Sequence, residues 1–131
     1  MKRHPALIEL SREHHTALKL SREAKRCALL GLPAESELFA KKLAQCFTTE
    51  IAAHFTTEER DFLPLLEARG LHALIERPLS EHAELRHLIV RLQQEPLPEY
   101  LARFGDLMEQ HVRFEERELF AAIELVLDRS A

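Results

Sequence analysis

Apolar residues recur three and four positions apart along most of the chain, the spacing that places them on one face of an α-helix. The pattern breaks at "GLPAES" (31–36) and "QQEPLPE" (93–99), where proline cannot continue a helix, and at Gly70, where a helix is expected to end. We therefore predict four helices, at about residues 5–30, 36–68, 79–94 and 98–128. Residues 71–77 are expected to form a short helical piece leading into the third helix, and Pro64 is expected to kink or end the second.

A β-strand that is buried on one face alternates apolar and polar residues with a period of two, and no segment does so. Four helices of this length with short links favour an up-down-up-down four-helix bundle, an all-α fold. The 131 residues are close to the usual size of one domain, so residues 1–131 are expected to form a single domain.

Composition excludes several classes of function. The formal net charge is −4 and no basic face dominates, which argues against a nucleic-acid partner. The longest apolar runs are far shorter than the roughly 20 residues that span a bilayer, so no membrane partner is expected. The two cysteines, Cys27 and Cys46, form neither a CxxC motif nor a disulfide framework, which favours the cytoplasm.

Histidine is unusually common, with eight residues against one tyrosine and no tryptophan. In the second predicted helix, His54 is in phase with the apolar positions Phe47, Ile51 and Phe62, where a leucine would be expected. Glu58 lies one turn further on the same face. The next residue, Glu59, is rotated away and is expected to face solvent, as is the arginine that follows it.

The fourth predicted helix repeats this arrangement, because "HFTTEERDFLP" (54–64) returns as "HVRFEERELFA" (111–121). His111 is in phase with Phe104, Leu107 and Phe114, and Glu115 again follows on the same face. Glu116 is expected to lie outside that face. Two helices thus each direct one histidine and one glutamate towards the core.

The other two helices each add a histidine. His82 is in phase with Leu79, Leu85 and Ile89. On the first helix, His14 and His15 are adjacent, so only one can point straight inwards. Periodicity favours His14, which is in phase with Leu7, Leu10 and Ala17, while His15 remains the alternative because a rotation of the helix would bring it inwards.

Two carboxylates on facing helices would repel each other in a core, and burial of each is costly unless it is paired or bound to a metal. A network of neutral imidazoles could satisfy them by hydrogen bonds, but a metal cation relieves the cost directly. Two carboxylates and four imidazoles are too many ligands for one tetrahedral zinc ion. They suit two metal ions bridged by Glu58 and Glu115, and this mixed ligand set fits iron best, with manganese, zinc and copper as alternatives.

The ordered set of histidines and HxxxE motifs resembles the hemerythrin-like (HHE cation-binding) domain family over nearly the whole chain. The residues that carry the resemblance are His54 with Glu58, His111 with Glu115, His82 in "EH", and His14 and His15 in "EHH". The resemblance implies a four-helix bundle that encloses a non-heme, carboxylate-bridged di-iron centre (Fe2+/Fe3+). It also implies binding or sensing of oxygen and, in some members, handling of nitric oxide or iron.

Two departures from the oxygen-carrying hemerythrins shift the expected function. Those proteins usually have HxxxH on the third helix, where this sequence has Arg86 four residues after His82, and HxxxxD on the fourth, where it has HxxxE. Both departures bring the ligand pattern closest to the repair-of-iron-centres proteins. One imidazole fewer leaves a coordination position for water, a small ligand or a further histidine such as His15.

The leading hypothesis is a di-iron protein that binds or senses oxygen, nitric oxide or peroxide, with a small diatomic molecule as its ligand. The alternatives are a di-iron oxidoreductase (an oxidase, a peroxidase or a nitric oxide reductase), an iron storage or donation protein, and a helical interaction module without metal. The sequence specifies no nucleophile, general base or pocket for an organic substrate, so whether the protein is an enzyme stays undecided. A protein partner and a homodimer also stay undecided.

Overall fold

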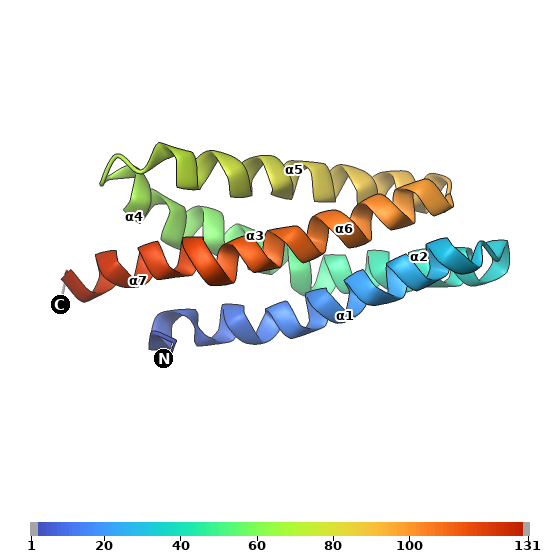
Figure 1. Cartoon of the computed structure of the whole chain (residues 1–131), viewed down its shortest axis with the longest axis horizontal. Helices are drawn as coiled ribbons and strands as arrows, with labels where there is room; N and C mark the ends of the chain where they lie inside the picture. Colours follow the sequence, from blue (N-terminus) through green and yellow to red (C-terminus); the bar gives the residue numbers. More distant parts are fainter. Residues whose placement is uncertain (1–2, 130–131) are drawn as a thin grey trace.

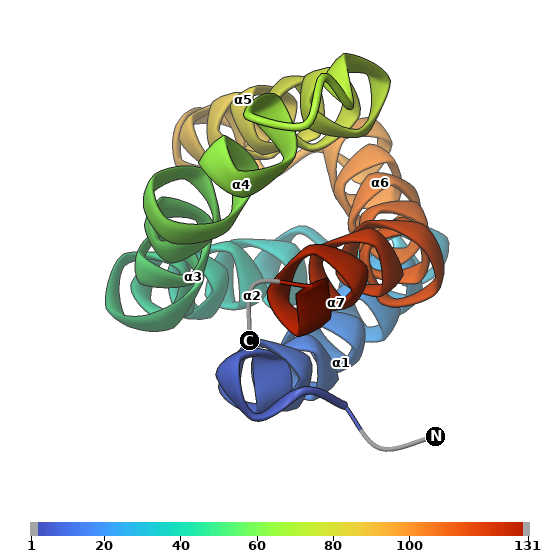
Figure 2. The same ribbon diagram turned by 90° about the vertical axis from the view of Figure 1, so that its left-hand side faces the viewer.

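The computed structural model describes residues 3–129 and confirms the all-α fold: its segments form four helical rods that run alternately up and down (Figure 1). No strand occurs in this part of the chain. Seen from the end that carries both termini, the four rods surround a common interior (Figure 2). Within the same range, no helix is both long and apolar enough to cross a membrane.

The first rod begins with a 3₁₀ turn, η1 (Pro5–Leu7), and continues as α1 (Ile8–Leu30). It ends at Gly31, whose φ of 61° lies in the left-handed region and whose N–H donates to the carbonyl of Cys27. Glycine adopts this conformation without steric cost, so it terminates the helix as the sequence predicts.

The second rod is continuous but is built from five segments: α2 (Pro33–Cys46), η2 (Phe47–Ile51), α3 (Ala52–Thr57), η3 (Glu58–Phe62) and α4 (Leu63–Glu67). It starts at Pro33, earlier than predicted, because proline is well suited to the first turn of a helix. Both η2 and η3 are π-helical turns. Pro64 does not stop the rod at once: it sits in the first turn of α4, where its missing N–H costs little, and the rod ends one turn later.

The third rod is a single helix, α5 (His72–Gln94). Residues 72–77 are thus helical and lead into the third helix, as predicted, but they belong to the same continuous helix. Pro78 lies inside α5 with its ring buried, so the helix tolerates the lost hydrogen bond in exchange for packing. The fourth rod joins α6 (Pro98–Phe114), a third π-helical turn η4 (Glu115–Leu119) and α7 (Phe120–Arg129).

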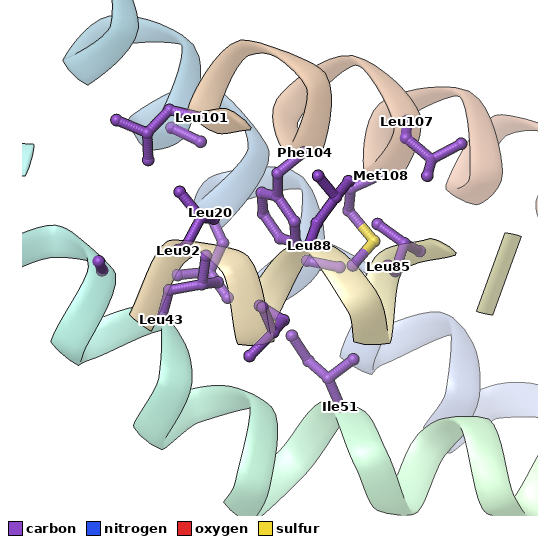
Figure 3. Packing of buried hydrophobic residues seen from close by; sticks show 14 of the residues in the cluster. Leu20, Leu43, Ile51, Leu85, Leu88, Leu92, Leu101, Phe104, Leu107 and Met108 are labelled. Carbon is purple, nitrogen blue, oxygen red and sulfur yellow. The ribbon is translucent and has the colours of Figure 1, made fainter. Parts of the chain in front are cut away.

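Two apolar clusters fill the interior and leave a polar layer between them. The larger one packs α1 and α2 against α5 and α6, with Leu20, Leu43, Leu92 and Phe104 among its members (Figure 3). The smaller one lies nearer the chain termini and includes Leu7, Leu10, Phe120 and Ile123. Along α1, Leu10 belongs to the smaller cluster and Ala17 to the larger, and His14 stands between them. The apolar packing on both sides thus fixes the height of the histidines in the bundle.

Candidate metal centre

Six of the seven side chains that the sequence singles out meet in this polar layer. Each is buried, and together they come from all four rods: His14 from α1, His54 and Glu58 from the second rod, His82 from α5, and His111 and Glu115 from the fourth. The seventh, His15, is exposed and lies outside the cluster. The phase of α1 with its apolar neighbours therefore turns His14, and not His15, to the interior.

The six side chains divide into two groups that share both glutamates. One group is His14, His54, Glu58 and Glu115; the other is Glu58, His82, His111 and Glu115. Within each group, one donor atom per residue lies within 4.8 Å of all the others. Such spacing is what two adjacent metal ions with common carboxylate ligands require.

Each glutamate directs its two oxygens to different groups. Oε2 of Glu58 lies 3.2 Å from Nε2 of His54, and its Oε1 lies 3.0 Å from Nε2 of His82. Oε1 of Glu115 lies 2.8 Å from Nε2 of His14, and its Oε2 lies 3.1 Å from Nε2 of His111. Both carboxylates therefore have the orientation of a bridging ligand.

Several of these inward atoms lack a hydrogen-bond partner among residues 3–129, although they are fully buried. They are both oxygens of Glu58, Oε2 of Glu115, and Nε2 of His82 and of His111. Buried polar atoms are nearly always satisfied, and unpaired ones are costly. Two carboxylates and imidazole nitrogens that converge without partners fit a site that binds metal cations.

The outer nitrogen of each imidazole is held by a second set of glutamates, which the sequence analysis did not identify. Each Nδ1 lies 2.6–2.9 Å from a carboxylate oxygen; the pairs are His14 with Glu116, His54 with Glu13, His82 with Glu59, and His111 with Glu81. We call these four residues the outer glutamates. A carboxylate only accepts, so these contacts allow each ring to donate from Nδ1 and to present the Nε2 lone pair to a metal ion in the interior, as metal-binding histidines do.

The outer glutamates correct one expectation. Glu59 and Glu116 face solvent only in part: their side chains are 27% and 31% exposed, and each reaches the imidazole of a neighbouring rod. Both follow directly on an inward glutamate, Glu58 or Glu115, at the start of a π-helical turn, η3 or η4. Turns of this kind are frequent at functional sites. In each of these turns, the first glutamate points into the centre, and the second contacts the outer nitrogen of an imidazole on a neighbouring rod.

Three of the outer glutamates also contact an arginine. Glu59 pairs with Arg86 at 3.2 Å, Glu81 with Arg77 at 3.1 Å and Glu116 with Arg3 at 3.1 Å. For Glu13, no arginine or lysine partner exists among residues 3–129. Arg86, at the position of the missing histidine, thus turns outwards to Glu59 and does not enter the centre.

The electrostatics show how strongly the centre attracts positive charge. Burial lowers the pKa of His54, but the nearby carboxylates of Glu115 and Glu58 outweigh it and raise the pKa to about 11. Burial also lowers the pKa of His111, but the charge of Glu115 outweighs this effect and raises the pKa to about 10. Burial and the neighbouring Glu115 raise the pKa of Glu58. Cations beside the two carboxylates, either imidazolium ions or metal ions, therefore stabilise their charged forms.

Aromatic rings shield the imidazoles. Phe55 stacks on His82 with ring centroids 3.9 Å apart, and Phe120 stacks on His14 at 5.3 Å. The phenylalanines in phase with the inward histidines in the sequence are Phe47, Phe62, Phe104 and Phe114; the last three are buried in the apolar clusters, and Phe47 is partly buried. Phe55 was missed because it follows His54 directly and so lies off the face that was counted.

A pocket opens beside the centre, between α1, the η2–α3 part of the second rod and α6. Its walls include His14, His54 and His111, and Glu13 and Glu50 also line it. The remaining walls are mostly apolar, and the free interior is ≈ 20 Å³. That is about the space a single water molecule needs. The pocket therefore suits a very small ligand and not an organic substrate.

The arrangement agrees with the comparison to known protein families. The model of the hemerythrin HHE cation binding domain matches residues 6–123, a span that contains all six buried side chains. Comparison with curated proteins and with solved structures gives no match. The match covers most of the chain, and the histidines and glutamates it spans form a cation-binding cluster in the bundle interior. The chain belongs to the hemerythrin HHE cation-binding domain family.

Proposed function

We propose that the chain holds two iron ions and that this di-iron centre binds or senses a small molecule such as oxygen, nitric oxide or peroxide. His14 and His54 would hold one iron ion, and His82 and His111 the other. Glu58 and Glu115 would bridge them.

The proposal rests on the positions of the carboxylate oxygens, because each glutamate directs one oxygen to each of the two groups. A single metal site would need only one oxygen from each glutamate. Here the two oxygens of Glu58 approach His54 and His82, and those of Glu115 approach His14 and His111. A mixed set of imidazoles and carboxylates suits iron, and the cysteine sulfurs that an iron–sulfur cluster needs are not part of either group.

Iron, when bound, supplies one-electron and oxygen chemistry that the amino acids lack. The chain supplies the surroundings. The outer glutamates hold each imidazole in one orientation, and Phe55 and Phe120 keep water away from the rings. Each ion would receive two imidazoles and a share of two carboxylates, which would leave a position for water or a small ligand.

The pocket supports a diatomic or similarly small ligand. It reaches the imidazoles of His14 and His54, and its interior is close to the size of one water molecule. The ligand pattern resembles the repair-of-iron-centres type more than the oxygen carriers, because Arg86 pairs with Glu59 and adds no imidazole. The free thiols of Cys27 and Cys46 support a reducing compartment, and we propose the cytoplasm.

The test is the metal content of protein purified without added metal, combined with anomalous scattering measured on both sides of the iron edge. We expect two iron ions per chain at the two groups. A Glu58→Gln and Glu115→Gln double variant keeps the shape of both side chains and removes the bridging charge, so it should lose the metal. A single tetrahedral zinc ion, or no metal in a folded protein, would contradict the proposal.

A further inference from the structure

The two halves of the centre differ in their access to solvent. The pocket reaches His14 and His54, and on the other half it touches His111 but not His82. His82 is fully buried beneath the stacked ring of Phe55. The guanidinium of Arg86 lies 5.4 Å from the centroid of that ring and is held by Glu59, so a second layer covers this side.

Charge at the pocket mouth is equally one-sided. Glu13 and Glu50 both line the pocket, and neither forms an ion pair with lysine or arginine within residues 3–129. The other three outer glutamates each have an arginine partner. Within that range, Glu13 contacts only the imidazole of His54, which is neutral when it binds a metal ion. A cleft lined by charge of one sign raises the local concentration of counter-ions. The mouth is therefore negative, while the covered side of the centre is neutralised.

A series of side chains that can bind metal leads from the mouth of the pocket to the interior. Glu50 is exposed, and Glu13 is partly exposed and accepts from Nδ1 of His54 at 2.9 Å. Nε2 of His54 in turn faces the buried carboxylate of Glu58. His111, also on the pocket wall, is buried and its Nε2 has no hydrogen-bond partner. Oxygen donors at the surface and nitrogen donors inside give a cation successive ligands along the pocket.

We propose that divalent metal ions enter and leave through this pocket, with Glu13 and Glu50 as a transient cation-docking site at its mouth. The metal ion held by His14 and His54 is then released or taken up before the ion held by His82 and His111. This inference rests on the proposed pair of metal ions. It adds a route and an order of loading, which a symmetric centre would not have.

The test is the release of ferrous iron from fully loaded protein into an excess of a colorimetric chelator without oxygen. Two phases are expected, each of one ion per chain. Glu50→Gln removes a charge from the mouth and should slow the fast phase by roughly fivefold, the effect of one charge on a divalent ion at about 8 Å in water. Thr16→Phe places a large ring on the pocket wall and should slow the same phase.

The matched control is Glu76→Gln, which removes the same charge from an exposed position on α5 away from the pocket. Its release should follow the unmodified protein. Circular dichroism of each variant checks that the bundle is folded. Release of both ions at one rate, or a fast phase unchanged by Glu50→Gln and Thr16→Phe, would overturn the inference and leave the di-iron proposal standing. A folded protein that takes up no second ion would instead overturn the di-iron proposal.

Discussion

Nδ1 of His82 lies 2.7 Å from Oε2 of Glu59, on the neighbouring rod. The same contact joins each rod to the next and closes a ring. Glu13 of the first rod contacts His54 of the second, and Glu59 of the second contacts His82 of the third. Glu81 of the third rod contacts His111 of the fourth, and Glu116 of the fourth contacts His14 of the first. Each rod thus gives one imidazole to the centre and one carboxylate to the next imidazole. The centre is held by contacts between all adjacent rods.

The bridging carboxylates should be the most sensitive positions for metal binding. Glu58→Ala and Glu115→Ala each remove two oxygens that face both groups, so we expect either variant to lose most of its metal. Elemental analysis after extensive dialysis measures the metal per chain. Glu118→Ala, an exposed glutamate of the same π-helical turn as Glu115, is the control and should keep full content. Full content in Glu58→Ala would rule out its bridging role.

The outer glutamates should have a smaller effect, because they orient the histidines without touching the metal. Removing such a partner typically lowers metal affinity by about 10–100-fold. We expect Glu59→Ala and Glu116→Ala to fall in that range in a competition titration with a chelator of known affinity. Glu59→Gln should be milder, because its amide oxygen still accepts from Nδ1. Wild-type affinity in both alanine variants would show that the ring plays no part in binding.

Without metal, the protein should lose stability as the pH rises. The folded-state pKa values of His54 and His111 are raised from 6.5 to about 11 and about 10. The stability that these imidazolium ions contribute is fully present below pH 6.5 and is lost as the pH rises through those values. Urea unfolding of metal-free protein should therefore show a lower midpoint at about pH 9.5 than at about pH 6. A midpoint that does not fall over this range would contradict the raised pKa values.

Metal should reverse this dependence, because the same nitrogens must be deprotonated to bind it. Iron-loaded protein is expected to be more stable than metal-free protein near neutral pH, by about 2.7 kcal/mol when free metal is at about 100 times its dissociation constant. Acid should release the metal and remove this difference. Equal unfolding midpoints with and without metal at neutral pH would mean that the folded bundle does not bind it preferentially.

Gly105 sets the distance between α1 and α6, which carry His14 and His111. A Cβ at this position would lie 2.6 Å from Cγ of Lys25 and 2.9 Å from the backbone oxygen of Ser21. The lysine can move, but the backbone oxygen moves only with the helix. Overpacking costs about 1–3 kcal/mol, whereas alanine gains roughly 0.5–1 kcal/mol as a helix former. Gly105→Ala should therefore destabilise the protein in thermal unfolding, while Gln110→Ala, at an exposed position of α6, should not.

Periodicity was sufficient to predict the four rods and the convergence of the six inward residues, because the spacing of apolar positions determines which side of a helix is buried. It also favoured His14 over His15 for the same reason. The outer glutamates were not predictable in this way. Glu13 and Glu81 stand just before an inward histidine, and Glu59 and Glu116 just after an inward glutamate. Such positions lie at the border between neighbouring rods, and their partners depend on how the rods pack.

The spacing of apolar residues also could not predict local departures from regular α-helix geometry. The π-helical turns η3 and η4 begin at Glu58 and Glu115, and their sequences do not differ in kind from ordinary helix. The helix α5 also continues through Pro78, which is buried. Neither feature follows from the spacing of apolar residues along the chain.

The reaction with oxygen is the last prediction and the one closest to function. The structure gives His82 no second imidazole one turn on, since Arg86 pairs with Glu59, and it gives His14 and His54 a pocket of about the size of a water molecule. A centre with few imidazoles and direct access for small molecules should react quickly. We expect anaerobically reduced, iron-loaded protein to oxidise on mixing with oxygen, in a change that removing oxygen does not reverse. Stopped-flow absorbance measures the rate, and zinc-loaded protein is the control that should show no change. A spectrum that reverts when oxygen is withdrawn would identify a carrier and contradict this prediction, and no reaction at all would favour a redox-inert metal.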